Sequence, residues 1–323
     1  MLTDNFGRRF YYLRLSITDV CNFRCNYCLP DGYQCDNDRD FLSLEEIIRV
    51  VRAFAKLGTE KIRITGGEPS LRKDLPEIIA ACKAVPGIKQ VAITTNGYKL
   101  PQMLPSWVDA GLDALNVSID SLDPKQFHRI TGHDKLATIL EGLAMAQQYP
   151  KLKVKVNAVL MRHFTSGAMN QYLQWLKHTP VTLRLIELMQ TGDNVRFFEE
   201  QHVGGEQIKQ SLLSDGWLPE IRSKTAGPAQ EFFHSDFQGK IGLIMPYSKD
   251  FCASCNRLRI SALGKLHLCL FAEQGLDLRQ YLQSDDTQPL TEAIAALMTD
   301  KKATHFLHDK LTGATKHLAM LGG

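Results

Sequence analysis

The sequence predicts an α/β fold for its first two hundred residues, and three observations lead to that prediction. Short runs of alternating polar and apolar residues recur along this part of the 323-residue chain. Segments whose apolar residues have helical spacing separate these runs. The first such segment opens with a capping box, Ser43-Leu44-Glu45-Glu46, and Gly58 ends it. Strands that are joined through helices form a parallel sheet.

Six strands are expected, and their side chains divide into two chemically different faces. The expected strands are Tyr12–Thr18, Lys61–Thr65, Val91–Asn96, Ala114–Asp120, Lys153–Val159 and Thr182–Glu187. Leu13 and Leu15 share one face of the first strand, whereas Arg14 and Ser16 share the other, and the same division recurs downstream. Helices would cover the apolar face, while the polar face would hold a charged ligand. Six units and a polar interior predict an incomplete (β/α)6 TIM-like barrel, since a closed eight-stranded barrel fills its interior with branched side chains. Alternation alone also fits a half-solvated antiparallel sheet, and only the helices argue against it.

Helices of similar length are expected between the later strands. After the first helix they are Leu75–Lys83, Met103–Ala110, Leu136–Gln148 and Met169–Lys177. The regular alternation is lost after about residue 200, where glycines separate shorter elements. Strands are expected there at Lys240–Ile244 and Leu258–Ser261, and a helix at Pro289–Met298. We therefore expect two domains, 1–200 and a C-terminal α+β region, 201–323.

Charge and composition exclude several classes of protein. There are 38 basic and 35 acidic residues, and a net charge of +3 does not favour bulk binding to nucleic acid or to a membrane surface. The chain shows neither an apolar stretch long enough to span a bilayer nor an apolar signal core near Met1, so a cytoplasmic protein is expected. In a reducing compartment, eight cysteines indicate metal binding or catalysis rather than disulfides.

Cys21, Cys25 and Cys28 form a Cys-x-x-x-Cys-x-x-Cys motif directly after the first expected strand. Three thiolates this close can face one soft metal centre, and a four-iron cluster held by three ligands keeps one iron open. The spacing alone also allows a zinc site whose fourth ligand is a remote histidine or Cys35.

A second set, Cys252, Cys255 and Cys269, begins with Cys-x-x-Cys. Structural zinc sites and thiol redox motifs share that spacing, so both remain possible readings of this motif alone. Arg257 and Arg259 follow it, two residues apart on an expected strand, and therefore project to the same side. Guanidinium pairs of this kind bind phosphate through forked hydrogen bonds.

Two motifs together resemble the radical S-adenosylmethionine superfamily. They are the first cysteine triplet, with Tyr27 before its last cysteine, and the glycine-rich segment Gly66-Gly67-Glu68-Pro69 after the second strand. Further segments make the chain similar to the GTP-cyclising family that performs the first step of molybdenum cofactor biosynthesis. These segments are Thr94-Thr95-Asn96-Gly97, Asn116-Val117-Ser118, the second triplet with Asn256-Arg257-Leu258-Arg259, and the terminal Gly322-Gly323.

The resemblance implies two 4Fe-4S clusters and S-adenosyl-L-methionine as cofactors. Cys21, Cys25 and Cys28 would hold the first cluster, and Cys252, Cys255 and Cys269 the second, whose open iron would bind the guanine of GTP. The positions that match the S-adenosylmethionine contacts of the family are Tyr27, Gly67, Thr94, Ser118, Asn157 and Met189. In that family a 5′-deoxyadenosyl radical takes hydrogen from the 3′ carbon of GTP, and the ribose radical then attacks carbon 8 of the base.

A triphosphate needs a local group of cations, since the chain as a whole has little excess charge. The residues expected to contact GTP are Arg14, Lys61, Arg63, Lys155, Arg184, Arg257 and Arg259. The first five lie on the expected polar face, so the strand pattern and the resemblance agree. The resemblance also implies catalytic roles for Arg14, Arg257, Arg259 and the Gly322-Gly323 pair, whose backbone would insert into the active site.

Further partners follow from the resemblance only. It implies an electron donor and a functional handover of product to cyclic pyranopterin monophosphate synthase, with a monomeric or homodimeric enzyme. The alternatives are a zinc-stabilised nucleotide- or RNA-binding module, and a peptide-modifying radical enzyme, which would generally carry more cysteines in its second half. Cys82 is expected to be a buried apolar residue, and His305 and His308 show no cysteine or carboxylate partner in register.

Overall fold

The computed structural model describes residues 1–34, 39–164 and 166–322. Cys35 and Gly323, both named in the sequence analysis, lie outside these ranges. Within the described residues, the strands form one twelve-stranded sheet in the order β12-β11-β10-β1-β2-β3-β4-β5-β6-β9-β8-β7. None of the helices in these ranges is long and apolar enough to cross a membrane.

The strand–helix alternation expected for the first part of the chain is confirmed. The first six strands are β1 (Tyr12–Ser16), β2 (Lys61–Thr65), β3 (Gln90–Thr95), β4 (Ala114–Ser118), β5 (Lys153–Leu160) and β6 (Thr182–Glu187). Each pairs in parallel with the next in sequence, so the antiparallel alternative is wrong for this part. The connecting helices are α1 (Leu44–Lys56), α2 (Leu75–Ala84), α3 (Leu100–Asp109), α4 (Pro124–Thr131), α5 (Leu136–Ala146) and α6 (Ser166–His178). The sequence analysis did not predict α4, a short helix that Asp123 caps by accepting a hydrogen bond from the Gln126 amide.

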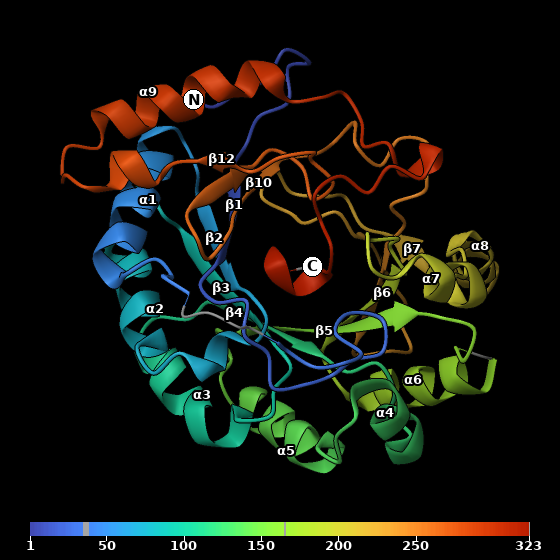
Figure 1. The fold of residues 1–323 in the computed structure, drawn as a ribbon. Coiled ribbons are helices and arrows are strands. Elements are labelled where there is room, and N and C mark those ends of the chain that lie inside the picture. Colours follow the sequence, from blue (N-terminus) through green and yellow to red (C-terminus); the bar gives the residue numbers. More distant parts are fainter. Residues whose placement is uncertain (35–38, 165, 323) are drawn as a thin grey trace.

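Apolar burial fixes which face of the sheet the helices cover. Leu13, Leu15, Ile62 and Ile64 are completely buried, as are Ile47 and Val50 on α1. Because side chains alternate along a strand, Arg14 and Arg63 then lie on the opposite face. Figure 1 shows α1 to α6 outside the curve of the sheet, and the C-terminal end at its centre.

The second part of the chain extends both ends of the same sheet. Its strands are β7 (Leu218–Pro219), β8 (Gln230–Phe233), β9 (Lys240–Ile244), β10 (Arg257–Ile260), β11 (Lys265–His267) and β12 (Leu276–Asp277). β9 pairs in parallel with β6, and β10 pairs in parallel with β1. The remaining elements are the helices α7 (Val195–Gln201), α8 (Glu206–Ser214) and α9 (Gln288–Leu297), and the 3-10 turns η1 (Pro69–Leu71), η2 (Arg279–Leu282), η3 (Met298–Asp300), η4 (Leu307–Asp309) and η5 (Leu318–Met320). The strand positions of Arg257 and Arg259 are therefore set by pairing with the beginning of the chain.

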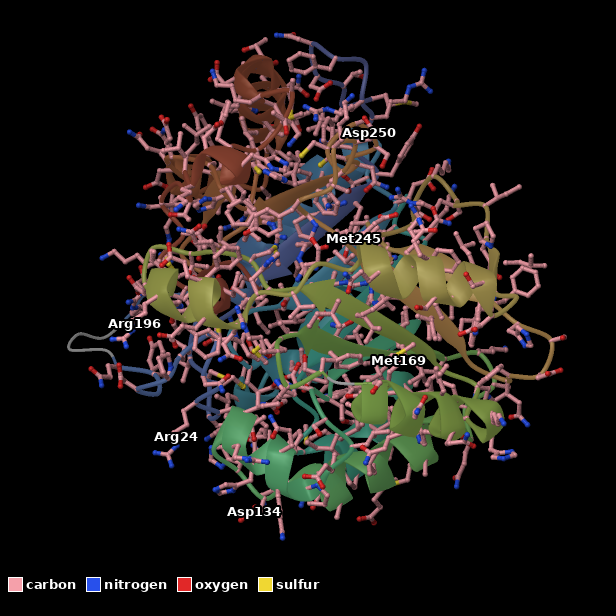
Figure 2. The ribbon with its side chains drawn as sticks, turned by 90° about the vertical axis from the view of Figure 1, so that its right-hand side faces the viewer. Arg24, Asp134, Met169, Arg196, Met245 and Asp250 are labelled. Carbon is pink, nitrogen blue, oxygen red and sulfur yellow. The ribbon has the colours of Figure 1, made fainter. Side chains whose placement is uncertain are left out.

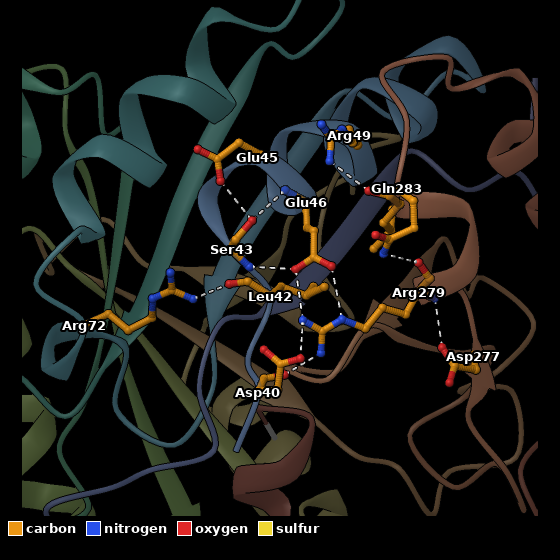
Figure 3. Close-up of polar contacts among 11 residues, drawn as sticks. Asp40, Leu42, Ser43, Glu45, Glu46, Arg49, Arg72, Asp277, Arg279 and Gln283 are labelled. Atoms are coloured by element: carbon orange, nitrogen blue, oxygen red, sulfur yellow. Dashed lines mark hydrogen bonds and ion pairs between the residues drawn. The ribbon is translucent and has the colours of Figure 1, made fainter. Parts of the chain in front are cut away.

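An ion pair ties this second part to the first helix. The capping box predicted at Ser43 is present: the Ser43 hydroxyl accepts from the Glu46 amide, and the Glu46 carboxylate accepts from the Ser43 amide. Arg279 then donates to both oxygens of Glu46, from Nε and from Nη2, each at 3.1 Å (Figure 3). One carboxylate thus caps α1 and binds η2 at the same time.

Charged side chains gather on the outside of the molecule. Arg24, Asp134 and Arg196 are exposed, and in the view of Figure 2 they lie at the rim, away from the strands. The buried charged side chains, by contrast, include Arg14, Arg63, Arg184 and Arg259, which are between 4% and 8% exposed. Buried arginines are uncommon and need a structural or functional reason.

Candidate functional site

The first cysteine loop follows β1 and packs backbone to backbone against the glycine-rich loop that follows β2. A Cβ atom on Gly66 would lie 2.1 Å from the Thr18 oxygen, and one on Gly67 would lie 2.3 Å from the Val20 oxygen. The Gly67 amide donates to Thr18 O at 2.9 Å, and the Glu68 amide donates to Val20 O at 2.8 Å. Only glycine allows this close approach, which fixes the cysteine loop against the sheet.

Glu68 connects the loops after β2 and β3 from a fully buried position. Its carboxylate accepts hydrogen bonds from the Ser70 amide at 3.0 Å, the Thr95 hydroxyl at 2.7 Å and the Asn96 amide at 2.6 Å. Burial raises the pKa of this carboxyl above its ordinary value, although the hydrogen bonds oppose the shift. The sequence analysis quoted Glu68 as part of a motif and did not assign this role.

All the residues expected to contact S-adenosylmethionine line one cavity together with the first cysteine triplet. The cavity is lined by Tyr27, Gly67, Thr94, Ser118, Asn157 and Met189, and by Cys21, Cys25 and Cys28. Each expected strand end contributes to it, as the carboxyl ends of parallel strands do in α/β proteins. The Oδ1 atom of Asn157 is buried and accepts no hydrogen bond from the described residues, so a ligand donor has a place to bind.

Asp120 lies on the same cavity, and its role was missed. The Tyr27 hydroxyl donates to Asp120 Oδ2 at 2.9 Å, and the Val159 amide donates to Oδ1 at 2.9 Å. Burial raises the pKa of Asp120 to about 6. The signal was present in the sequence, because Asp120 follows Ser118 by two residues and so continues the polar side of that strand.

The second cysteine triplet lines a neighbouring cavity. Cys252 and Cys255 lie between β9 and β10, and Cys269 follows β11. The expected residues Arg14, Arg63, Arg184, Arg257 and Arg259 line this cavity as well. Strand register explains how they meet: Arg259 pairs with Arg14, which pairs with Arg63 on its other side. The guanidinium groups of three adjacent strands therefore stand in one row.

Two expected cations do not reach the surface of this cavity. The Lys61 ammonium lies 5.0 Å from the centre of the Tyr12 ring and donates to the Thr225 oxygen at 3.4 Å. Lys155 forms an ion pair with Glu231 on β8. Burial lowers the pKa of both ammonium groups, that of Lys61 to about 8. Neither of them is among the residues that line the cavity.

His305 has the cysteine partner that the sequence analysis did not find. It lines the same cavity as Cys252, and its Nε2 atom contacts Pro246 O at 2.8 Å. Burial opposes ionisation of Cys252, but the His305 contact prevails and lowers the pKa of the thiol to about 7. The helical turn here is Leu307–Asp309, so His305 lies outside it. Helical spacing was therefore the wrong way to search for partners of His305.

The C-terminal segment enters the site. Arg14 donates to the Gly322 oxygen, and Arg259 Nη1 lies 3.1 Å from both the Leu321 and the Gly322 oxygens. Gly322 lines the first cavity and has a φ of +60°, and a Cβ atom there would lie 2.2 Å from the Thr65 hydroxyl oxygen. Gly322 therefore lies between the first cavity and two of the expected arginines, whereas Gly323 lies outside the described residues.

The two cavities adjoin. Asn157, Ile186 and Met189 line both of them. The two cysteine triplets therefore face connected spaces and do not lie on opposite sides of the molecule. In the ranges described, no group of three or more His, Cys, Asp or Glu side chains is arranged to hold a single metal ion. Cys82, the remaining described cysteine, is buried on α2 as expected.

Two family models match consecutive parts of the chain. A Radical SAM superfamily model matches residues 15–176, and a Molybdenum Cofactor Synthesis C model matches residues 181–307. Among solved structures, the chain resembles Streptococcus suis SuiB bound to S-adenosylmethionine, with a TM-score of 0.61, 14% identity, and coverage of 90% of this chain and 68% of that one. At this identity, the likeness shows the fold alone.

Curated relatives are much more similar. A GTP 3′,8-cyclase of Yersinia pestis is 58% identical over 323 residues, which is 100% of this chain and 99% of the relative. A GTP 3′,8-cyclase of Pectobacterium atrosepticum is 57% identical over 325 residues, with the same coverage. Both family models, full-length coverage and the paired cysteine cavities agree, and the chain belongs to the GTP 3′,8-cyclase family of radical S-adenosylmethionine enzymes.

Proposed function

We propose that this protein cyclises GTP to (8S)-3′,8-cyclo-7,8-dihydroguanosine 5′-triphosphate, using S-adenosylmethionine and a reductant, as the first step of molybdenum cofactor biosynthesis. The observation that carries the proposal is the pair of adjoining cavities, each lined by three cysteines and sharing Asn157, Ile186 and Met189. A nucleotide in one cavity and a cosubstrate in the other would bring their reacting atoms together near these three shared residues. The identities of 57–58% over the full length support this substrate.

The fold supports a finer architectural proposal. We assign β1 to β6 and their helices to an incomplete (β/α)6 barrel within residues 1–200. Residues 201–323 then form the region that carries the second cluster and most of the guanine site. The parallel order of β1 to β6 and the placement of α1 to α6 outside the curve of the sheet support this division.

The first cavity suits a 4Fe-4S cluster and S-adenosylmethionine. Cys21, Cys25 and Cys28 would hold the cluster, which supplies the electron that cleaves the cosubstrate when both are bound. The chain's own contribution is positioning. Asn157 offers an unsatisfied acceptor, and Gly66 and Gly67 line the same cavity. Tyr27, Thr94, Ser118 and Met189 would complete the contacts.

The second cavity suits a second 4Fe-4S cluster and GTP. Cys252, Cys255 and Cys269 would hold the cluster, and the row of Arg259, Arg14 and Arg63 would bind phosphate. Arg184 on β6 and Arg257, the first residue of β10, add positive charge. We propose that Lys61 and Lys155 add positive charge without lining the cavity. Lys155 would exchange its ion pair with Glu231 for one with phosphate when GTP binds. Arg14, Arg259 and the Gly322-Gly323 tail would position the ribose against the first cavity.

Partners of this reaction follow from its chemistry. The cleavage step consumes an electron, so a reducing protein or small molecule must supply it, and the product would pass to cyclic pyranopterin monophosphate synthase. We propose that the enzyme works in the cytoplasm as a monomer or homodimer, without nucleic acid or membrane. A zinc-stabilised binding module and a peptide-modifying enzyme are not favoured by the full-length relatives.

Anaerobic reconstitution tests the proposal. Protein with about eight irons should form 5′-deoxyadenosine from S-adenosylmethionine and dithionite only when GTP is present, and should convert GTP to the cyclised product. Mass spectrometry would detect both compounds. Formation of 5′-deoxyadenosine at the same rate with and without GTP, or binding of two zinc ions and no iron, would contradict it.

A further inference from the structure

The second cysteine triplet lies between two cavities. One is the cavity that the expected arginines line, and the other, the outer cavity, is lined by the same three cysteines and by residues that follow α9. The charged residues that line the outer cavity are Arg8, Glu273, Asp300, Lys301 and Lys302. The triplet can therefore be approached by charged groups from a side that the proposed function does not use.

Lys301 is the buried lysine of the outer cavity, at 5% exposed. Its ammonium donates a hydrogen bond to the Leu268 oxygen, one residue before Cys269, and lies 5.2 Å from the centre of the Phe10 ring. Neither partner carries a negative charge. Among the described residues, no carboxylate forms an ion pair with Lys301. A buried ammonium without a counter-charge is costly, so an anion is needed near it.

The other charged groups at the outer cavity do not need this anion, nor do they supply it. Glu273, Asp300 and Lys302 are exposed, so water solvates their charges. The Arg8 guanidinium is paired already, because its Nε atom lies 2.6 Å from Oδ2 of the Asp4 carboxylate. Lys301 therefore differs from its neighbours in being both buried and unpaired with a carboxylate.

The three cysteines supply an anion when they bind iron. Thiols lose their protons on binding a metal, and a four-iron cluster on three thiolates carries a net negative charge. Lys301 is close enough to act on these sulfurs: burial raises the pKa of the Cys269 thiol, and the Lys301 ammonium is among the groups that oppose this rise. The charge that is unbalanced without a cluster is thus balanced with one.

We propose that Lys301 is the counter-cation of the second cluster and raises its reduction potential. The inference rests on the proposed function, because it needs a cluster at the second triplet. One electron enters the cluster on reduction, from the reductant that the reaction already requires, and no bond forms or breaks. A nearby positive charge favours the reduced form, whose negative charge is larger by one unit.

Potentiometric titration followed by electron paramagnetic resonance tests the inference. It is made on reconstituted full-length protein in a Cys25→Ala background, so that the signal comes from the second cluster, and is repeated with all six cysteines present. Lys301→Met should lower the potential by about 59 mV, which corresponds to a tenfold change in a one-electron equilibrium. A unit charge at ~10 Å has an effect of this size at an effective dielectric constant of ~20.

Three further variants separate the charge of Lys301 from its hydrogen bond and its position. Lys301→Arg keeps both the charge and a donor for the Leu268 oxygen, and should keep the wild-type potential. Lys301→Gln keeps a donor without the charge, and should lower the potential as Lys301→Met does. Lys302→Met is the matched control, because it removes an exposed charge from the next residue at the same cavity, and should leave the potential unchanged.

The outcomes are distinct. A wild-type potential in Lys301→Gln would assign Lys301 a hydrogen-bonding role and overturn the inference, and so would equal shifts in Lys301→Met and Lys302→Met. Loss of second-cluster iron from the Met and Gln variants but not from Lys301→Arg would support it, whereas loss from all three would overturn it. An unchanged potential in Lys301→Met contradicts the inference alone. Absence of iron at the second triplet when Lys301 is present contradicts the proposed function.

Discussion

The two cysteine cavities adjoin but differ in how the chain prepares them. Around the first triplet, burial raises the pKa of the Cys25 and Cys28 thiols, and the nearby Asp120 carboxylate adds to the effect. Around the second, burial opposes ionisation in the same way, yet Arg257 and Lys301 prevail and lower the pKa of Cys255. The first cavity relies on close backbone packing, and the second on positive charge. We infer that the first selects its ligand mainly by shape and the second mainly by charge.

Removing a thiol from the first cavity should have the largest effect. Cys25→Ala should lower GTP-dependent formation of 5′-deoxyadenosine by ~10³-fold or more, as loss of one member of a catalytic unit does. Chromatography of the quenched reaction measures it. Cys82→Ala is the matched control, because it removes a buried thiol on α2 far from both triplets in sequence. Equal losses in the two variants would indicate misfolding instead of a lost ligand.

Adding a side chain to Gly322 should displace the C-terminal segment from the site. Gly322→Ala places a methyl group 2.2 Å from the Thr65 hydroxyl oxygen, so the tail must move. We expect cyclisation to fall by ~10²-fold, the effect of a misplacement of about 1 Å, while iron content stays unchanged. Gly7→Ala controls for backbone strain, since Gly7 also has a positive φ, +74°, but no atom within 4 Å of the added carbon. If the Gly322→Ala enzyme cyclised GTP at the wild-type rate, the C-terminal segment would have no role in the reaction.

Replacing a guanidinium of the arginine row should affect the second cavity only. Arg259→Lys keeps the charge but loses the planar guanidinium, whose Nη1 atom reaches both the Leu321 and the Gly322 oxygens. The KM for GTP should rise by roughly 10- to 100-fold, the cost of about 1.5–3 kcal/mol for a hydrogen bond to a charged group. Binding of S-adenosylmethionine, measured by equilibrium dialysis, should be unchanged. If both ligands weakened equally, the two cavities would not be separable by charge.

The smallest effect should come from the contact that joins the two parts of the chain. Arg279→Lys replaces the fork on Glu46 by a single ammonium, and should lower the free energy of unfolding by about 1 kcal/mol. Arg49→Lys, whose partner Asp285 is largely exposed, should change it by less than about 0.5 kcal/mol. Urea denaturation of the two variants measures the difference. A larger loss in Arg49→Lys would contradict this order.

The sequence predicted the regular part of the fold well because that part depends on local pattern. Strands Lys61–Thr65 and Thr182–Glu187 have the expected bounds, since alternation and flanking breakers both mark them. The helix Pro124–Thr131 was missed because it is short and its apolar face is small. Strand pairing between β10 and β1 could not be predicted, because no local pattern connects segments so far apart.

Candidate site residues lie together in the structure where a motif or a face assignment marked them in the sequence. All six contacts expected around S-adenosylmethionine line one cavity, and five of the seven cations expected around GTP line the other. Lys61 and Lys155 do not line it, because they contact Tyr12 and Glu231, and these contacts depend on tertiary packing. Tyr12 also lines the second cavity, and the sequence analysis did not name it because an aromatic residue at the start of a strand is more often part of a core.

The position of β10 beside β1 has a consequence for how the protein folds. β1 is synthesised first and pairs with β2 on one edge. Its other edge stays unpaired until β10, from late in the chain, has been synthesised. Contacts of such long sequence separation form slowly, and an unpaired strand edge can associate with the wrong partner. A chain interrupted before β10 would therefore expose this edge, and we expect truncated forms to aggregate.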